Sequence, residues 1–203
     1  MIISHKHRFI FVKTRKTAGS TFEKLMSPYL GPDDICTGST RDGTPALNIE
    51  PDTNGHISLQ DIRNKYFPNG ITYDIISIER NPYDKVVSSY YWHQHIKENQ
   101  FGHMDFETYV KSCNMLPQDW GLYTLQGLLP PKLKMFHYES MDAMYHWIKK
   151  SRGVHIVLDK VGQTKLKSGI RKIQDYKELH TGISKKVVEI VFAQELKEFS
   201  YEF

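Results

Sequence analysis

The feature that most constrains the fold is a short apolar run followed by a polar turn and an amphipathic segment. Phe9 to Val12 are aromatic or β-branched, which predicts a fully buried strand. The polar turn runs from Lys13 to Gly19, and Ser20 and Glu23 then have the spacing of a helix capping box. The sequence therefore predicts a strand, a loop and a helix ending near Tyr29.

The same alternation of strand and helix continues along the chain. An apolar run from Ile71 to Ile78 predicts a second buried strand, and Asn81 and Pro82 suit the N-cap and first position of a helix reaching His95. We expect further helices at 58–66, 106–113, 120–126, 141–149 and 184–199, and further strands at 134–137 and 154–158. The pattern predicts an α/β fold in one domain, residues 1–203, with a mostly parallel sheet flanked by helices.

Composition narrows the class of protein. The 27 Lys and Arg residues exceed the 23 Asp and Glu residues by only four, so the chain lacks the basic excess of a nucleic-acid binder. Cys36 and Cys113 are far apart and have no metal-ligand spacing. The apolar run near the start spans only Phe9 to Val12, so we expect no signal peptide. The sequence has no apolar run of about 20 residues, the length that crosses a bilayer. We therefore expect a cytoplasmic protein with no membrane, nucleic-acid or metal partner.

The loop after the first strand has the parts of an anion site. Backbone N–H groups at a helix start attract anions, Gly19 allows close approach, and Lys16, Ser20 and Thr21 add a cation and two hydroxyls. A Walker A loop would place its lysine after the second glycine, whereas Lys16 precedes Gly19. Taken alone, this segment is equally compatible with a tight turn carrying solvated lysines.

A second candidate anion site follows the strand ending near Ile78. Arg80 comes where ligands bind in open α/β sheets, outside the carboxyl ends of the strands. Ser88 lies about two turns into the next helix and can face the same side. The alternative is that Arg80 pairs with a carboxylate and Ser88 is an ordinary helix residue.

Together these segments resemble the PAPS-dependent sulfotransferases, whose donor is 3′-phosphoadenosine 5′-phosphosulfate. Lys16-Thr17-Ala18-Gly19-Ser20-Thr21 resembles the family loop that binds the 5′-phosphosulfate, and Arg80 followed by Ser88 resembles its 3′-phosphate motif. Gly55-His56-Ile57-Ser58 is similar to the segment with the catalytic histidine in the carbohydrate-sulfating branch. The final residues 199–203 are also similar to the ends of relatives in that branch.

The resemblance implies a P-loop-like fold and a specific reaction. A sulfuryl group passes from PAPS to a hydroxyl or amine of a small-molecule or carbohydrate acceptor, leaving 3′-phosphoadenosine 5′-phosphate (PAP), without a metal. Lys16 is expected on the bridging oxygen and His56 as general base. The residues expected to bind the donor are Arg15, Lys16, Thr17, Ala18, Gly19, Ser20, Thr21, Arg80 and Ser88.

Some points stay open at the level of the sequence. The family usually has Pro where this chain has Arg15, and the direction of that added cation is not fixed. Trp92, Tyr91 and Phe22 are all candidates to stack on adenine. The competing functions are a P-loop nucleotide kinase and a catalytically inactive module that binds PAP or PAPS.

Overall fold

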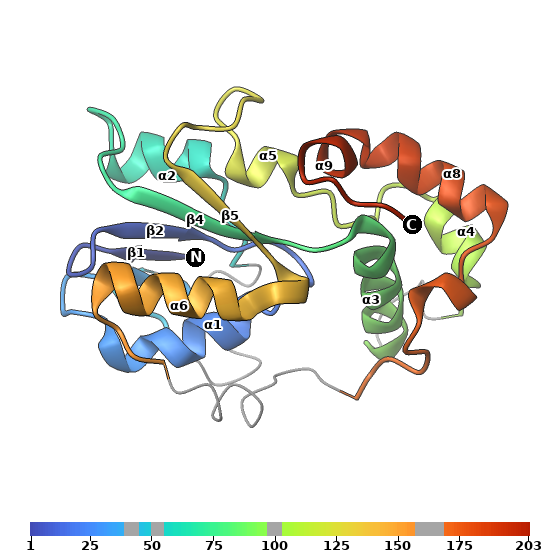
Figure 1. Ribbon diagram of the computed structural model, residues 1–203, viewed down its shortest axis with the longest axis horizontal. Helices are drawn as coiled ribbons and strands as arrows, with labels where there is room; N and C mark the ends of the chain where they lie inside the picture. Colours follow the sequence, from blue (N-terminus) through green and yellow to red (C-terminus); the bar gives the residue numbers. More distant parts are fainter. Residues whose placement is uncertain (39–44, 50–54, 97–102, 157–168) are drawn as a thin grey trace. The chain divides into compact units, whose positions relative to one another are not determined.

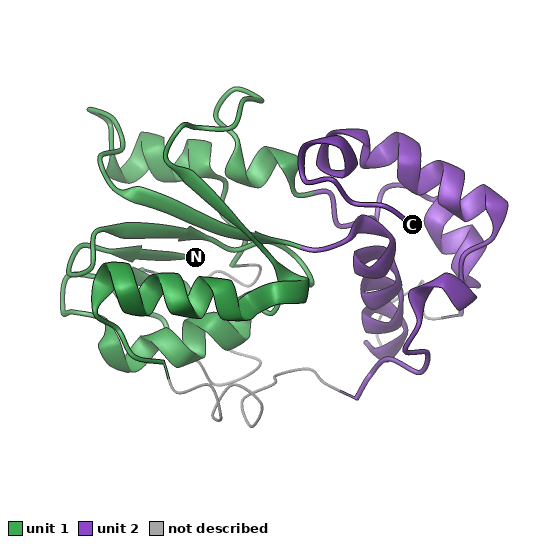
Figure 2. Cartoon of the chain, in the orientation of Figure 1, with its two compact units in different colours: residues 1–79, 119–166 green, residues 80–118, 167–203 purple. Residues whose placement is uncertain are grey.

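The computed structural model describes residues 1–38, 45–49, 55–96, 103–156 and 169–203. The chain divides into two compact units, and each is described by itself (Figure 2). Unit 1 comprises Met1–Glu79 and Asp119–Leu166, and unit 2 comprises Arg80–Gln118 and Lys167–Phe203.

Unit 1 is built on a five-stranded sheet of order β3-β1-β2-β4-β5 (Figure 1). The strands are β1 (Ile2–Ser4), β2 (Phe9–Val12), β3 (Ile35–Cys36), β4 (Asp74–Glu79) and β5 (Leu133–His137). β2, β4 and β5 run parallel, whereas β1 is antiparallel to both β2 and β3. The α/β prediction is confirmed. The sheet is mixed because β1 is antiparallel to its neighbours, and the sequence analysis did not foresee the short strands β1 and β3.

Helices cover both faces of this sheet (Figure 1). Side chains alternate across a strand, so Phe9 and Phe11 point to one face, where they pack with Phe22 of α1 and Ile148 of α6. α2 and α5 lie on the opposite face. The bounds of these helices are α1 Gly19–Met26, α2 Leu59–Tyr66, α5 Trp120–Tyr123 and α6 Met141–Arg152, with short 3₁₀ turns η1 (Ser27–Tyr29) and η2 (Tyr138–Ser140).

The described part of unit 2 is helical. It comprises α3 (Pro82–His95), α4 (Phe106–Lys111), η3 (Tyr176–Glu178), α8 (Gly182–Val191) and α9 (Ala193–Glu198). Its core joins Val86 and Tyr90 of α3 to Tyr109 of α4 and Val188 of α8. These contacts come from segments about 100 residues apart in the sequence, so they bring the C-terminal helices onto α3.

The helix cap at Asn81 was predicted correctly, and two other elements were not. Asn81 accepts a hydrogen bond from the Tyr83 amide (3.0 Å), as predicted for α3, and Ser58 caps α2 by accepting one from the Asp61 amide (3.1 Å). The strand predicted at 154–158 is absent from residues 154–156, and 157 and 158 lie outside the described residues. The predicted closing helix is two helices, because the backbone leaves helical geometry at the buried residue Phe192.

Candidate functional site

The loop between β2 and α1 has an unusual backbone. Lys16 and Ala18 both lie in the left-handed region, with φ of 61° and 60°. For residues other than glycine this conformation costs roughly 1–2 kcal/mol each, and it persists only where the surroundings enforce it. The loop that carries Lys16 is therefore held in place by its contacts.

Two threonines supply part of that restraint. The Thr17 hydroxyl shares its proton between the hydroxyl oxygen of Thr14, at 2.8 Å, and the carbonyl oxygen of Thr14, at 3.1 Å. The Thr14 hydroxyl in turn donates to the carbonyl of Ile78 in β4. The loop is thus tied to the neighbouring parallel strand.

The start of α1 differs from the sequence prediction. The helix begins at Gly19 with Ala18 as its N-cap, and no side chain of the described residues caps it. The predicted capping box of Ser20 and Glu23 is wrong, because both residues already lie within the helix and Glu23 binds elsewhere. A helix start without a side-chain cap leaves backbone donors suited to an anionic ligand.

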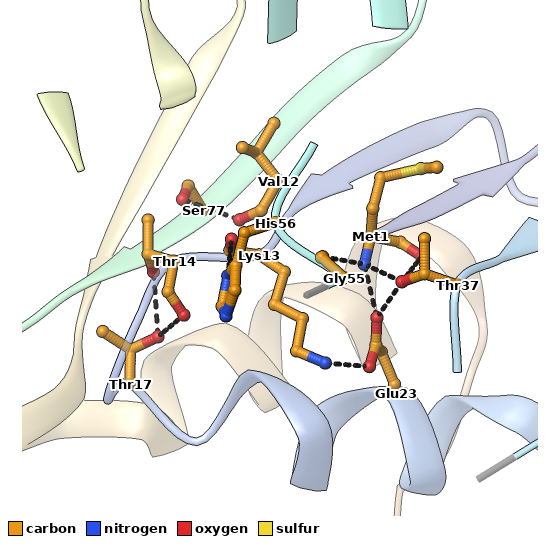
Figure 3. Close-up of polar contacts among 10 residues, drawn as sticks. All are labelled: Met1, Val12, Lys13, Thr14, Thr17, Glu23, Thr37, Gly55, His56 and Ser77. Atoms are coloured by element: carbon orange, nitrogen blue, oxygen red, sulfur yellow. Dashed lines mark hydrogen bonds and ion pairs between the residues drawn. The ribbon is translucent and has the colours of Figure 1, made fainter. Parts of the chain in front are cut away.

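Glu23 is instead the centre of a buried polar cluster (Figure 3). Its carboxylate accepts hydrogen bonds from the Met1 ammonium, the Lys13 ammonium (2.6 Å) and the Thr37 hydroxyl (2.9 Å). Two cations thus share one carboxylate out of contact with water. Burial lowers the pKa of the Met1 ammonium, because removal from water disfavours its charged form.

Lys13 connects three parts of this region. Its side chain passes so close to Gly19 that a Cβ there would meet Lys13 Cγ at 2.7 Å. At its far end, a Cβ on Gly55 would lie 3.3 Å from Lys13 Nζ, and Gly55 itself has a φ of +61°. Close approach to Lys13 therefore requires glycine at position 19, whereas the left-handed backbone favours glycine at position 55. The sequence analysis had not singled out this lysine.

His56 is anchored to the same lysine. Its Nδ1 lies 2.8 Å from the carbonyl oxygen of Lys13 (Figure 3). Since a carbonyl can only accept, Nδ1 carries the proton and the lone pair of the neutral ring is on Nε2. Burial lowers the pKa of His56 from 6.5 to about 4, which outweighs the opposing hydrogen bond from Nδ1–H to Lys13, so the ring is neutral at pH 7.

The side chain of Arg15 is directed toward Asp119, the residue before α5. One carboxylate oxygen of Asp119 accepts the Arg15 amide at 2.8 Å, and the other accepts its guanidinium at 2.8 Å. Asp119 is fully buried, whereas Arg15 is about half exposed. The direction of this cation, which the sequence left open, is thus set by a residue 104 positions away.

Unit 2 carries the second group of predicted residues. Both Nε and a terminal nitrogen of Arg80 bind Asp84 Oδ2, at 2.8 and 2.6 Å, and Asp84 Oδ1 accepts the guanidinium of Arg171. The carboxylate partner that was the alternative for Arg80 therefore exists, but it is shared with a second arginine. Ser88 is partly exposed and lies one turn beyond Asp84 on the same side of α3.

The predicted residues thus form two groups. Lys16 and His56 belong to unit 1, where His56 binds the carbonyl of Lys13, three residues before Lys16. Arg80 and Ser88 belong to unit 2 and adjoin Asp84. The sequence analysis missed Lys13, Glu23, Asp119 and Arg171, whose roles depend on contacts between distant segments. Of the three aromatic candidates, Phe22 is buried in the core against Phe11, with ring centroids 4.6 Å apart.

Comparison with known proteins identifies the fold. No family model matches the sequence, and no curated protein matches it. The structure is similar to that of mouse sulfotransferase SULT7A1 complexed with PAP, with a TM-score of 0.55 and 12% sequence identity. The similarity covers 96% of this chain and 86% of the mouse chain. The chain therefore has a sulfotransferase-like, P-loop-like fold.

Two further observations concern membranes and metals. Within the described ranges, no helix is both long and apolar enough to span a bilayer. The same part of the chain holds no group of three or more His, Cys, Asp or Glu side chains that could bind a metal ion.

Proposed function

We propose that this protein is a sulfotransferase that uses PAPS as donor and transfers its sulfuryl group to a hydroxyl or amine of a small-molecule or carbohydrate acceptor. The observation that carries the proposal is the link from the Lys16 loop to His56 through Lys13. A cation and a neutral imidazole are thereby held on adjoining segments of one unit, on a fold shared with a PAP-bound sulfotransferase.

The 5′-phosphosulfate of the donor is assigned to the start of α1. Arg15, Lys16, Thr17 and Ala18 form the approach to that helix, and Gly19, Ser20 and Thr21 form its first turn. An uncapped helix start and a glycine pressed against Lys13 suit a phosphate bound mainly by backbone N–H groups. The Lys16 ammonium supplies the positive charge that offsets the negative phosphosulfate.

The transfer itself requires a base and charge stabilisation. The acceptor oxygen or nitrogen attacks sulfur, the bond from sulfur to the bridging oxygen breaks, and PAP leaves with the electron pair. Lys16 stabilises the negative charge that develops on the bridging oxygen. His56 Nε2 takes the acceptor's proton, because the carbonyl of Lys13 holds the other ring nitrogen in its protonated form.

The 3′-phosphate is assigned to Arg80 and Ser88. Arg80 follows β4 directly, and β4 runs parallel to β2, the strand that leads into the Lys16 loop. Arg80 and Arg171 both bind Asp84, so two guanidinium groups gather at one carboxylate. Guanidinium groups bind phosphate through charge-assisted hydrogen bonds, which suits this position to the 3′-phosphate.

The test is release of PAP from PAPS in the presence of phenol, amine and sugar acceptors, in turn. Lys16→Ala and His56→Ala are expected to lower turnover by roughly 100-fold or more, the usual scale for charge-stabilising groups and general bases. Lys24→Ala and His146→Ala are matched controls, because both side chains are exposed on helices of the same unit. The controls are expected to retain full turnover.

Two results would count against the proposal. Unchanged turnover in His56→Ala would remove this residue as the base, and no PAP release with any acceptor class would leave no support for transferase activity. A kinase would instead consume ATP in the presence of magnesium, and an inactive module would bind PAP without turnover.

A further inference from the structure

Asp119 is a buried carboxylate for which the proposed reaction gives no role. It directly precedes α5, and both of its oxygens accept hydrogen bonds from Arg15, one from the backbone amide and one from the guanidinium. A carboxylate that is fully buried must be compensated by hydrogen bonds and an opposite charge. The contacts with Arg15 supply both.

Arg15 immediately precedes the strained part of the donor loop. The next residue, Lys16, is left-handed, and Ala18 is left-handed two residues later. Thr14 and Thr17 restrain the loop through hydrogen bonds to each other and to Ile78 of β4, and the Arg15 amide is fixed from a further segment of the chain. Asp119 therefore supplies a long-range restraint just before Lys16.

We propose that Asp119 is a positioning residue that fixes the strained donor loop, and with it the Lys16 ammonium, by holding Arg15 at both its backbone and its side chain. This inference rests on the proposed function, since it assigns the loop to the donor. The guanidinium of Arg15 is the countercharge of Asp119, so the side chain of Arg15 is held at the same carboxylate as its backbone amide.

The same pair acts on His56 through its charges. Asp119 raises the pKa of His56, while Lys13 and Arg15 lower it, all against the larger lowering caused by burial. If Asp119 and Arg15 are arranged as a pair beside the site, their removal should move this pKa in opposite directions. A neutral residue, or a charge remote from His56, would not produce such a signed effect.

The experiment compares Arg15→Gln, Arg15→Lys and Asp119→Asn with the parent protein. The pKa of His56 is followed by NMR through its ring proton, assigned by its disappearance in His56→Gln. Arg15→Gln is expected to raise this pKa, Asp119→Asn to lower it, and Arg15→Lys to leave it close to about 4, because the cation is retained. Exposed Asp142 provides the control, and Asp142→Asn is expected to leave the pKa unchanged.

PAP affinity is measured on the same proteins by calorimetry. Asp119→Asn is expected to weaken PAP binding by about tenfold, since the loop loses its restraint, whereas Asp142→Asn binds like the parent. A His56 pKa that stays fixed in Arg15→Gln overturns the inference, and so does full PAP affinity in a folded Asp119→Asn. Should Asp119→Asn not fold, the pKa in Arg15→Gln decides alone.

These readouts separate the inference from the proposed function. The pKa changes need no nucleotide, so they report on the Asp119 and Arg15 pair even if the parent protein does not bind PAP. Absence of PAP binding to the parent would contradict the proposed function, and opposite pKa changes would still support the charge arrangement around His56.

Discussion

Replacing Glu23 by Gln tests the buried cluster that holds the side chain of Lys13. The carboxylate accepts from the Met1 ammonium, the Lys13 ammonium and the Thr37 hydroxyl, and all of these groups are buried. A glutamine of nearly the same shape keeps one acceptor oxygen, but it places an NH₂ donor where a cation now binds. At least one buried ammonium then loses its ionic partner.

The magnitude follows from the burial of that pair. Removing one partner of a buried ion pair costs about 3–5 kcal/mol, because the other charge is left uncompensated. We expect Glu23→Gln to lose free energy of unfolding in that range at pH 7, and to weaken PAP binding as the Lys13 side chain loses its fixed position beside Gly19. The exposed substitution Glu198→Gln is the matched control, with a change within about 0.5 kcal/mol.

Urea unfolding followed by circular dichroism measures these changes. The double variant Lys13→Met/Glu23→Gln removes a cation together with the carboxylate, so its loss should be smaller than the sum of the single losses by roughly 1–3 kcal/mol. A loss below about 1 kcal/mol for Glu23→Gln, or strict additivity in the double variant, would refute a buried ion pair at this position.

Two more predictions follow from the same region. The pKa of His56 is about 4 in the folded protein and near 6.5 in the unfolded chain, so the unfolded chain binds more protons between these two pH values. The free energy of unfolding should therefore fall as the pH drops through this window, by up to about 1.4 kcal/mol per pH unit. His56→Gln should lessen that slope in urea midpoints measured from pH 7 to pH 4.5, and an identical slope would contradict the shift. Gly19→Ala should destabilise the protein by about 1–3 kcal/mol and weaken PAP binding, because the new methyl would meet Lys13 Cγ at 2.7 Å. Gly121→Ala, which would contact nothing within 4 Å, is its control, and equal losses in both variants would refute the clash.

Elements governed by neighbouring residues were predictable from sequence. β2 has the predicted bounds, and α3 starts at Pro82 behind its Asn81 cap, because strand hydrophobicity and helix capping act within a few residues. β1 was missed because three residues give too short a pattern, and its strand character depends on pairing with β2. The sequence predicted that Glu23 caps its own helix, but its carboxylate instead binds the Met1 and Lys13 ammonium groups.

The candidate site was predictable only where a motif names the residue. Lys16 and His56 were proposed from their motifs, and the hydrogen bond that holds His56 to Lys13 is a result of the fold. Asp119 meets Arg15 across 104 residues, and Arg171 meets Asp84 across 87, so no pattern along the chain could have paired them. The roles of Arg80, Ser88 and the other donor-binding residues stay predictions.

Calorimetric titration with PAP, adenosine 5′-monophosphate and ATP with magnesium tests the central claim most directly. The account predicts one PAP site per chain, with affinity at least about tenfold above that for the monophosphate, because only PAP presents a 3′-phosphate to Arg80. Arg80→Gln should remove most of this difference. Equal affinity for PAP and the monophosphate, or tight binding of ATP with magnesium alone, would contradict the account.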